Sequence, residues 1–136
     1  MFVKKTIATT VLICATAFPL IGYAELVIHN ETNQFSTSII NHGSCSTDIL
    51  GDDGVTPPNT TKTIPDWQIN IACYPDYENC IADVYMTNNC SGKLITTVTF
   101  SATTGIKNAT KPVDGYDIKY SGFSVTLSGG PPAKKK

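Results

Sequence analysis

The segment between Cys73 and Cys80 holds the densest group of side chains that could bind a ligand. It reads Tyr-Pro-Asp-Tyr-Glu-Asn, with two tyrosines beside two carboxylates and an amide. Exposed tyrosines stack on sugar rings or pack on protein surfaces, and the polar groups can hydrogen-bond hydroxyls. The alternative is that the rings pack over the disulfide or the hairpin next to them. The candidate ligand-binding residues are therefore Tyr74, Asp76, Tyr77, Glu78 and Asn79.

A catalytic function would have to use one of the two histidines, His29 and His42. Neither belongs to a recognisable triad motif, and both flank expected strands. We therefore assign no catalytic residue and expect a non-enzymatic binding domain of unknown protein or glycan ligand. A small secreted hydrolase with a non-contiguous site is the alternative. A histidine hydrogen-bonded to a carboxylate within a cleft would favour it, whereas solvated histidines on a convex surface would count against it.

Metal and cofactor sites are not expected. Asp48, Asp52 and Asp53 could supply oxygen ligands to Ca²⁺, but they do not match the EF-hand pattern, and Asp-Asp-Gly is an ordinary turn sequence. The cysteine spacings contain no Cys-x2-Cys pair of the kind that binds zinc.

The charge distribution argues against a nucleic-acid partner. All ten basic residues are lysines, and residues 25–133 carry five lysines against eleven carboxylates, a formal charge of −6. Nucleic-acid binding needs a basic face and uses the forked donors of arginine. The three lysines at positions 134–136 give only weak, salt-sensitive attraction to an anionic surface.

Residues 1–24 have the organisation of a cleavable signal peptide. Lys4 and Lys5 precede an apolar run from about Ile7 to Ile21, and small residues follow at Gly22 and Ala24. We expect cleavage after Ala24. A membrane anchor is disfavoured because the run contains threonines and a proline and falls short of the ~20 apolar residues that span a bilayer. The mature protein is thus expected to be secreted or periplasmic, monomeric and free of stable membrane insertion.

Cysteine counting predicts two disulfides. Removal of Cys14 with the signal leaves Cys45, Cys73, Cys80 and Cys90, an even number in a short exported chain. Cys80 and Cys90 flank an expected strand and would lie too far apart to pair. A hairpin with Cys73 and Cys80 facing each other at its loop end favours Cys73–Cys80 and Cys45–Cys90.

Alternation of apolar and polar residues recurs along the mature chain, and helical periodicity is absent. Residues 122–128 are the clearest case, and in residues 93–101 the side chains of Leu94, Val98 and Phe100 are expected to face the core. Trp67, Ile69 and Ile71 alternate in the same way. The expected strands cover residues 25–29, 34–41, 61–64, 67–73, 81–87, 93–101, 116–120 and 122–128.

Seven or eight short strands with frequent turn signals indicate an all-β fold, an antiparallel β-sandwich of immunoglobulin-like or related Greek-key type. The domain is expected to span residues 25–128. Residues 46–60 are expected to form a long irregular loop, because Pro57 and Pro58 cannot donate ladder hydrogen bonds. Residues 129–136 are expected to form a disordered, lysine-rich tail.

Four segments carry a resemblance to a known group of proteins: HNETN at residues 29–33, Cys-Ser at 45–46, and residues 80–100 and 115–127. On these segments the chain resembles small, signal-bearing, two-disulfide β proteins of unknown function from intracellular bacterial pathogens. This resemblance implies a bacterial exported protein and transfers no functional residue.

Overall fold

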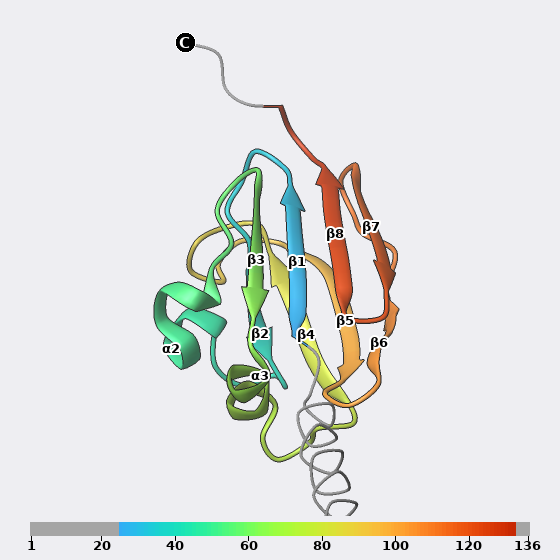
Figure 1. Cartoon of the computed structure of the whole chain (residues 1–136). Helices are drawn as coiled ribbons and strands as arrows, with labels where there is room; N and C mark the ends of the chain where they lie inside the picture. The colour runs from blue at the N-terminus through green and yellow to red at the C-terminus, as the bar shows by residue number, and fades with distance from the viewer. Residues whose placement is uncertain (1–24, 133–136) are drawn as a thin grey trace, which may run out of the picture.

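Two four-stranded sheets lie face to face in this computed structural model, which describes residues 25–132 (Figure 1). The all-β fold class is confirmed. One sheet has the order β3 (Thr60–Ile64), β1 (Leu26–Glu31), β8 (Ser124–Gly129) and β7 (Tyr116–Ser121). The other has the order β2 (Thr37–Ile40), β4 (Cys80–Tyr85), β5 (Leu94–Ser101) and β6 (Gly105–Ala109).

The strand pairs are antiparallel with one exception. β1 and β8 run parallel, with Ile28 opposite Val125. A parallel pair needs a long crossover connection, and these are the first and last strands of the described chain, so all the other strands lie between them in sequence. The expected antiparallel sandwich therefore contains one parallel pair.

Alternating apolar residues of the two sheets meet in the core. Ala82 and Val84 of β4 and Val98 and Phe100 of β5 are buried from one side, and Leu127 of β8 from the other. The alternation of β5 breaks near its start, where the register with β4 shifts between Val84 and Tyr85. A bulge of this kind moves side chains to the other face.

Leu94 was expected in the core and is instead 43% exposed. Its neighbour Ile95 is only 5% exposed and occupies the interior in its place. The bulge between β4 and β5 is the reason, because it moves the side chains at the start of β5 by one position.

The expected strand at residues 67–73 is wrong, because this segment forms helix α3 (Asp66–Cys73). Pro65 precedes it with extended backbone, and Asp66 stands in its first turn, where a carboxylate is favourable. Residues four apart share a helix face. Ile69 and Cys73 are buried, whereas Trp67 and Ile71 are exposed, which separates residues that strand alternation would place together.

The expected long loop at residues 46–60 is also wrong. It contains helix α2 (Ser46–Leu50) and the 3₁₀ turn η2 (Gly51–Gly54), and β3 begins at Thr60. The buried hydroxyl of Ser46 organises this segment, because it accepts from Ser38 N at 3.1 Å and donates to Gly54 O at 2.5 Å. These contacts hold α2 and η2 beside the start of β2.

The disulfides are Cys45–Cys90 and Cys73–Cys80, with Cα separations of 5.9 and 5.4 Å. These are the two pairs expected, but the hairpin used to infer them is wrong. Cys73 is the last residue of α3, and only Cys80 opens a strand. The second bridge therefore joins a helix end to a strand start.

The two ends of the sequence extend past the described residues. β8 reaches Gly129, one residue into the expected tail, and Gly130 N donates to Gly115 O at 3.2 Å. The expected signal peptide, residues 1–24, and the terminal lysines lie outside the described part. No helix among residues 25–132 is long and apolar enough to cross a bilayer.

Candidate functional site

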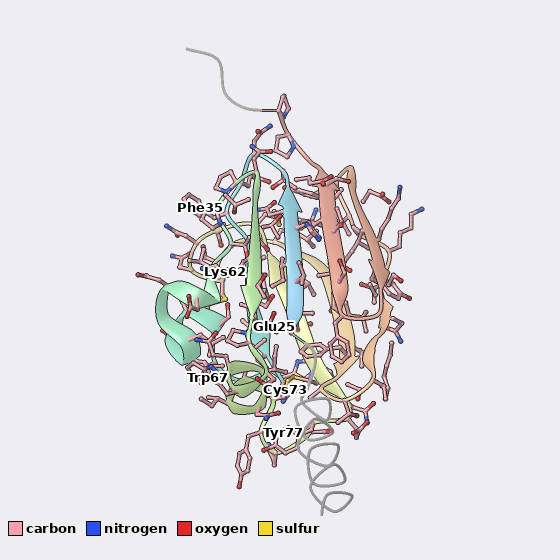
Figure 2. The ribbon with its side chains drawn as sticks, in the orientation of Figure 1. Glu25, Phe35, Lys62, Trp67, Cys73 and Tyr77 are labelled. Carbon is pink, nitrogen blue, oxygen red and sulfur yellow. A yellow bond between two sulfur atoms is a disulfide. The ribbon has the colours of Figure 1, made fainter. Side chains whose placement is uncertain are left out.

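The candidate ligand-binding residues lie in the loop between α3 and β4. Cys73 and Cys80 bound this loop, and both are fully buried. Figure 2 places Cys73 and Tyr77 at the same end of the molecule as Trp67 of α3. The disulfide thus anchors the base of the loop in the core and leaves residues 74–79 on the surface.

The two tyrosines of the loop are its exposed aromatic side chains. Tyr74 is 70% exposed and Tyr77 37% exposed. Their ring centroids lie 6.2 Å apart at an interplanar angle of 64°, an edge-to-face arrangement. Aromatic pairs favour this geometry. The rings therefore support each other and still offer apolar surface to solvent.

The exposed carboxylate of Glu78 is hydrogen-bonded to two hydroxyl groups of the protein. Its two carboxylate oxygens accept hydrogen bonds from Ser101 Oγ and Thr103 Oγ1, each at 2.9 Å. These two bonds, Ser101 first, lower the pKa of Glu78 because they stabilise its ionised form. Ala102 N also donates to Tyr77 O at 2.7 Å. The loop is thereby tied to the end of β5.

Asp76 and Asn79 also contribute to the structure of the loop. Asp76 Oδ1 accepts from Asn79 N at 3.1 Å, which closes a turn. Asn79 Oδ1 accepts from Lys107 Nζ of β6 at 2.8 Å. The polar members of the predicted site thus hold the loop, and the tyrosines form its outer surface.

Two further residues join this surface and were not expected there. Trp67 is 58% and Ile71 53% exposed on α3. They stand four residues apart, and Tyr74 follows three residues later with its N–H bonded to Asn70 O at 3.1 Å, as in a continuing helical turn. We call the four side chains Trp67, Ile71, Tyr74 and Tyr77 the aromatic end.

A histidine and a carboxylate meet elsewhere in the molecule. His42 Nδ1 lies 3.3 Å from Asp83 Oδ2, and Thr97 Oγ1 donates to Asp83 Oδ1 at 2.7 Å. The imidazole is 69% exposed, whereas the Asp83 side chain is 14% exposed. A carboxylate in this position can orient the ring. In the described chain no hydroxyl or thiol is hydrogen-bonded to the second ring nitrogen of His42.

The remaining candidates form no shared site. His29 Nδ1 lies 3.1 Å from the exposed Thr61 hydroxyl. Asp53 Oδ2 accepts from Gln68 Nε2 at 2.8 Å, and its other oxygen lies 3.7 Å from Lys62 Nζ. Between residues 25 and 132, no group of three or more metal-ligating side chains gathers.

Comparison with known proteins places the chain in context. A family model described as the T2SS substrate NttC matches residues 1–131. The fold is similar to the crystal structure of the Legionella pneumophila type II secretion system substrate NttC, with a TM-score of 0.64 and 24% sequence identity over 79% of this chain and 98% of that one. No curated protein has significant sequence similarity to the chain. These matches confirm the resemblance to small exported β proteins of bacterial pathogens.

Proposed function

Because the chain belongs to the NttC family of type II secretion system substrates, we propose that it is an exported, non-enzymatic binding domain that docks through its aromatic end. Membership of this family confirms the expected export, secreted or periplasmic. Docking and its partner are the proposed part, and they rest on one observation. Trp67 and Ile71 are exposed four residues apart on helix α3, and Tyr74 and Tyr77 are exposed as a contacting ring pair on the disulfide-closed loop that follows it.

The composition of this surface is typical of a binding site. Trp and Tyr carry much of the free energy of protein association, because they bury large apolar areas at low entropic cost. The buried disulfide and the contacts of Glu78 hold the loop before any partner arrives. A surface ordered in advance loses less conformational entropy when it binds.

A protein partner fits this surface better than a glycan. Sugar hydroxyls need free polar groups around a stacked ring, but Glu78 and Asn79 already bond Ser101, Thr103 and Lys107. Ile71 stands between Trp67 and Tyr74 in the sequence of the aromatic end, and its aliphatic side chain suits apolar packing. Three carboxylates, Asp66, Asp76 and Glu78, neighbour the aromatic end in sequence. The complementary partner surface is therefore apolar with basic groups around it.

The single tryptophan makes the proposal measurable. The chain has one Trp, and Trp67 belongs to the aromatic end. Residues 25–132 immobilised on a resin, challenged with secreted and host-cell protein fractions, should retain a partner that Trp67→Ala and Tyr74→Ala lose. The purified partner should shift the fluorescence emission of Trp67 to shorter wavelength and protect it from quenching by acrylamide, because docking removes the indole from water.

Tyr120→Ala provides the matched control. Tyr120 is 42% exposed on β7 and lies outside the aromatic end. The proposal requires this variant to bind like the wild type. Equal loss of the partner in Tyr120→Ala and Trp67→Ala would contradict it. A Trp67 emission shift produced by soluble oligosaccharides, with no protein partner required, would replace the protein ligand by a glycan.

The hydrolase alternative is supported by one observation, the contact of His42 with Asp83. Against it stand the high exposure of the imidazole and the absence, in the described residues, of a nucleophile bonded to it. A general base must reach the proton that it removes. Hydrolysis of p-nitrophenyl acetate that disappears in His42→Ala would favour the enzyme, and equal background rates in both proteins would favour the binding domain.

A further inference from the structure

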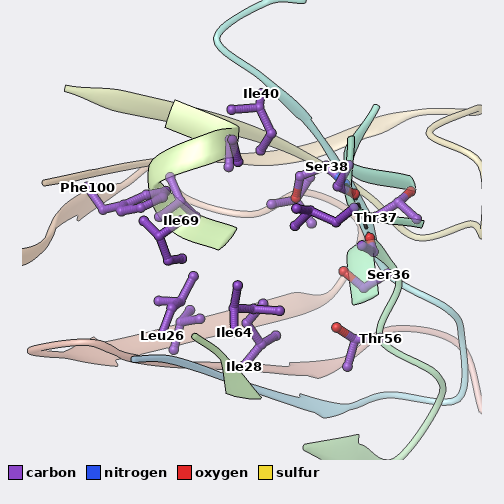
Figure 3. A pocket seen from close by; sticks show the side chains of 18 of the residues that line it. Leu26, Ile28, Ser36, Thr37, Ser38, Ile40, Thr56, Ile64, Ile69 and Phe100 are labelled. Carbon is purple, nitrogen blue, oxygen red and sulfur yellow. Dashed lines mark hydrogen bonds between the residues drawn. The ribbon is translucent and has the colours of Figure 1, made fainter. Parts of the chain in front are cut away.

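An apolar cavity of about 120 Å³ lies between the two sheets. Leu26, Ile28 and Ile64 line it from one sheet, and Ile40 and Phe100 from the other (Figure 3). Ile69 of α3 reaches into the same space. Protein interiors are normally filled to high density, so a space of this size inside so small a domain is unusual.

One end of the cavity carries hydroxyl groups. Ser36 and Thr56 form an isolated antiparallel bridge with mutual backbone bonds of 3.0 Å, just before β2 and β3. Side chains directly opposed across such a bridge lie on the same face. Figure 3 shows both hydroxyl oxygens directed toward the cavity. Ser36 and Thr56 lie at its other end from Leu26, Ile69 and Phe100. The cavity is therefore amphipathic.

The wall near α3 contributes an unpaired acceptor. Gln68 is 6% exposed, lines the cavity, and donates from Nε2 to Asp53 Oδ2 at 2.8 Å. This bond fixes which amide atom is oxygen. Gln68 Oε1 is buried and has no hydrogen-bond partner in the described residues. A buried acceptor without a partner is costly, and a ligand hydroxyl that reached it would remove that cost.

Charge limits the class of ligand. The residues that line the cavity include no lysine, and their one charged member is Asp53. A carboxylate ligand would find no counter-ion there and would be repelled. Size limits it too, since a cavity of roughly 150 Å³ holds benzene. A ligand of about six or seven non-hydrogen atoms is the upper range for this space.

We propose that this cavity binds a small, neutral amphiphile, whose apolar chain or ring packs between Ile28, Ile40 and Phe100 and whose single hydroxyl bonds the Ser36–Thr56 end or Gln68. This site is separate from the aromatic end, so failure of one proposal leaves the other untouched.

The probe is 1-hexanol, followed by NMR on residues 25–132 labelled at isoleucine and leucine methyl groups. We expect saturable shifts at Ile28, Ile40 and Leu127, with a dissociation constant on the order of 1 mM for so small a ligand. Hexanoate, which has the same chain and a negative charge, should bind at least tenfold more weakly. Shifts confined to the aromatic end, or equal binding of hexanoate, would overturn the proposal.

Two variants test the cavity itself. Thr56→Val keeps the shape and the backbone bridge but removes one hydroxyl, and it should weaken 1-hexanol about two- to tenfold. Ala82→Leu puts added volume into the space and should abolish the shifts. Methyl spectra without ligand establish that each variant is folded. Undiminished binding by a folded Ala82→Leu protein would show that the ligand lies elsewhere.

Discussion

The two disulfides differ in the length of chain that they close and in the region that they hold. Cys45–Cys90 joins residues 45 positions apart and ties the start of α2 to the segment after β4. Cys73–Cys80 joins residues only 7 positions apart and ties the end of α3 to the start of β4. The first pair is partly exposed, whereas the second is fully buried beneath the aromatic end.

Because of this difference, we expect one disulfide to act mainly on the stability of the whole fold and the other mainly on the position of the loop. A cross-link lowers the entropy of the unfolded chain by an amount that grows with the loop it closes, and the loop-closure estimate is about 4 kcal/mol for the long loop and about 2.5 kcal/mol for the short one. The long bridge therefore acts on the whole fold. The short bridge contributes less globally, but it determines where Tyr74 and Tyr77 stand.

Removal of the long bridge should have the largest effect on stability. Cys45→Ala with Cys90→Ala is expected to lower the free energy of unfolding by about 4 kcal/mol, because the unfolded chain regains the freedom of its longer loop. Urea unfolding measures this loss. The amide shifts of residues 74–79 should stay as in the wild type. If this variant loses less unfolding free energy than the Cys73/Cys80 variant, Cys45–Cys90 is not the bridge that stabilises the whole fold.

Removal of the short bridge should have a smaller global and a larger local effect. Cys73→Ala with Cys80→Ala is expected to cost about 2.5 kcal/mol. The same spectra should show large shifts at residues 74–79, and the partner captured by the aromatic end should bind more weakly than to the Cys45/Cys90 variant. Unchanged shifts would mean that the contacts of Glu78 alone position the tyrosines.

The regions that the sequence predicts well are those governed by local alternation. β7, β8 and the later part of β5 follow apolar residues at period two, and the number of cysteines left after Cys14 predicts two disulfides. Helix α3 was missed because eight residues are too few to separate the two periodicities. The wrong strand prediction also hid the aromatic end, because strand alternation placed Trp67 and Ile71 on the same face as the buried Ile69.

The remaining parts of the site depend on contacts between distant residues. Glu78 meets Ser101 and Thr103 across 23 and 25 positions, and Asn79 meets Lys107 across 28. No local pattern in the loop reports that its polar groups are already engaged. The cavity between the sheets is likewise a property of packing, to which Leu26, Ile40 and Phe100 contribute from three separate strands.

Acidification should affect the aromatic end through Glu78, with the smallest of these effects. Hydrogen bonds from Ser101 and Thr103 lower its folded-state pKa. Ionised Glu78 therefore contributes stability above the unfolded-state pKa of about 4.3, and this contribution disappears as the pH falls through the lowered folded-state pKa. The wild type should melt at a higher temperature than Glu78→Gln at pH 7, and this difference should shrink as the pH falls below the unfolded-state pKa.

The control for this titration is Glu31→Gln, which removes an exposed carboxylate at the end of β1. Subtracting the change in melting temperature of Glu31→Gln at each pH corrects for the change in net charge that both variants share. A gap between wild type and Glu78→Gln that stays constant from pH 7 to 3 would show that the ionised form is not what holds the loop. The gap should remain smaller than the effect of either disulfide, because Glu78 is exposed and solvent screens its contacts, whereas Cys73–Cys80 fixes both ends of the loop covalently.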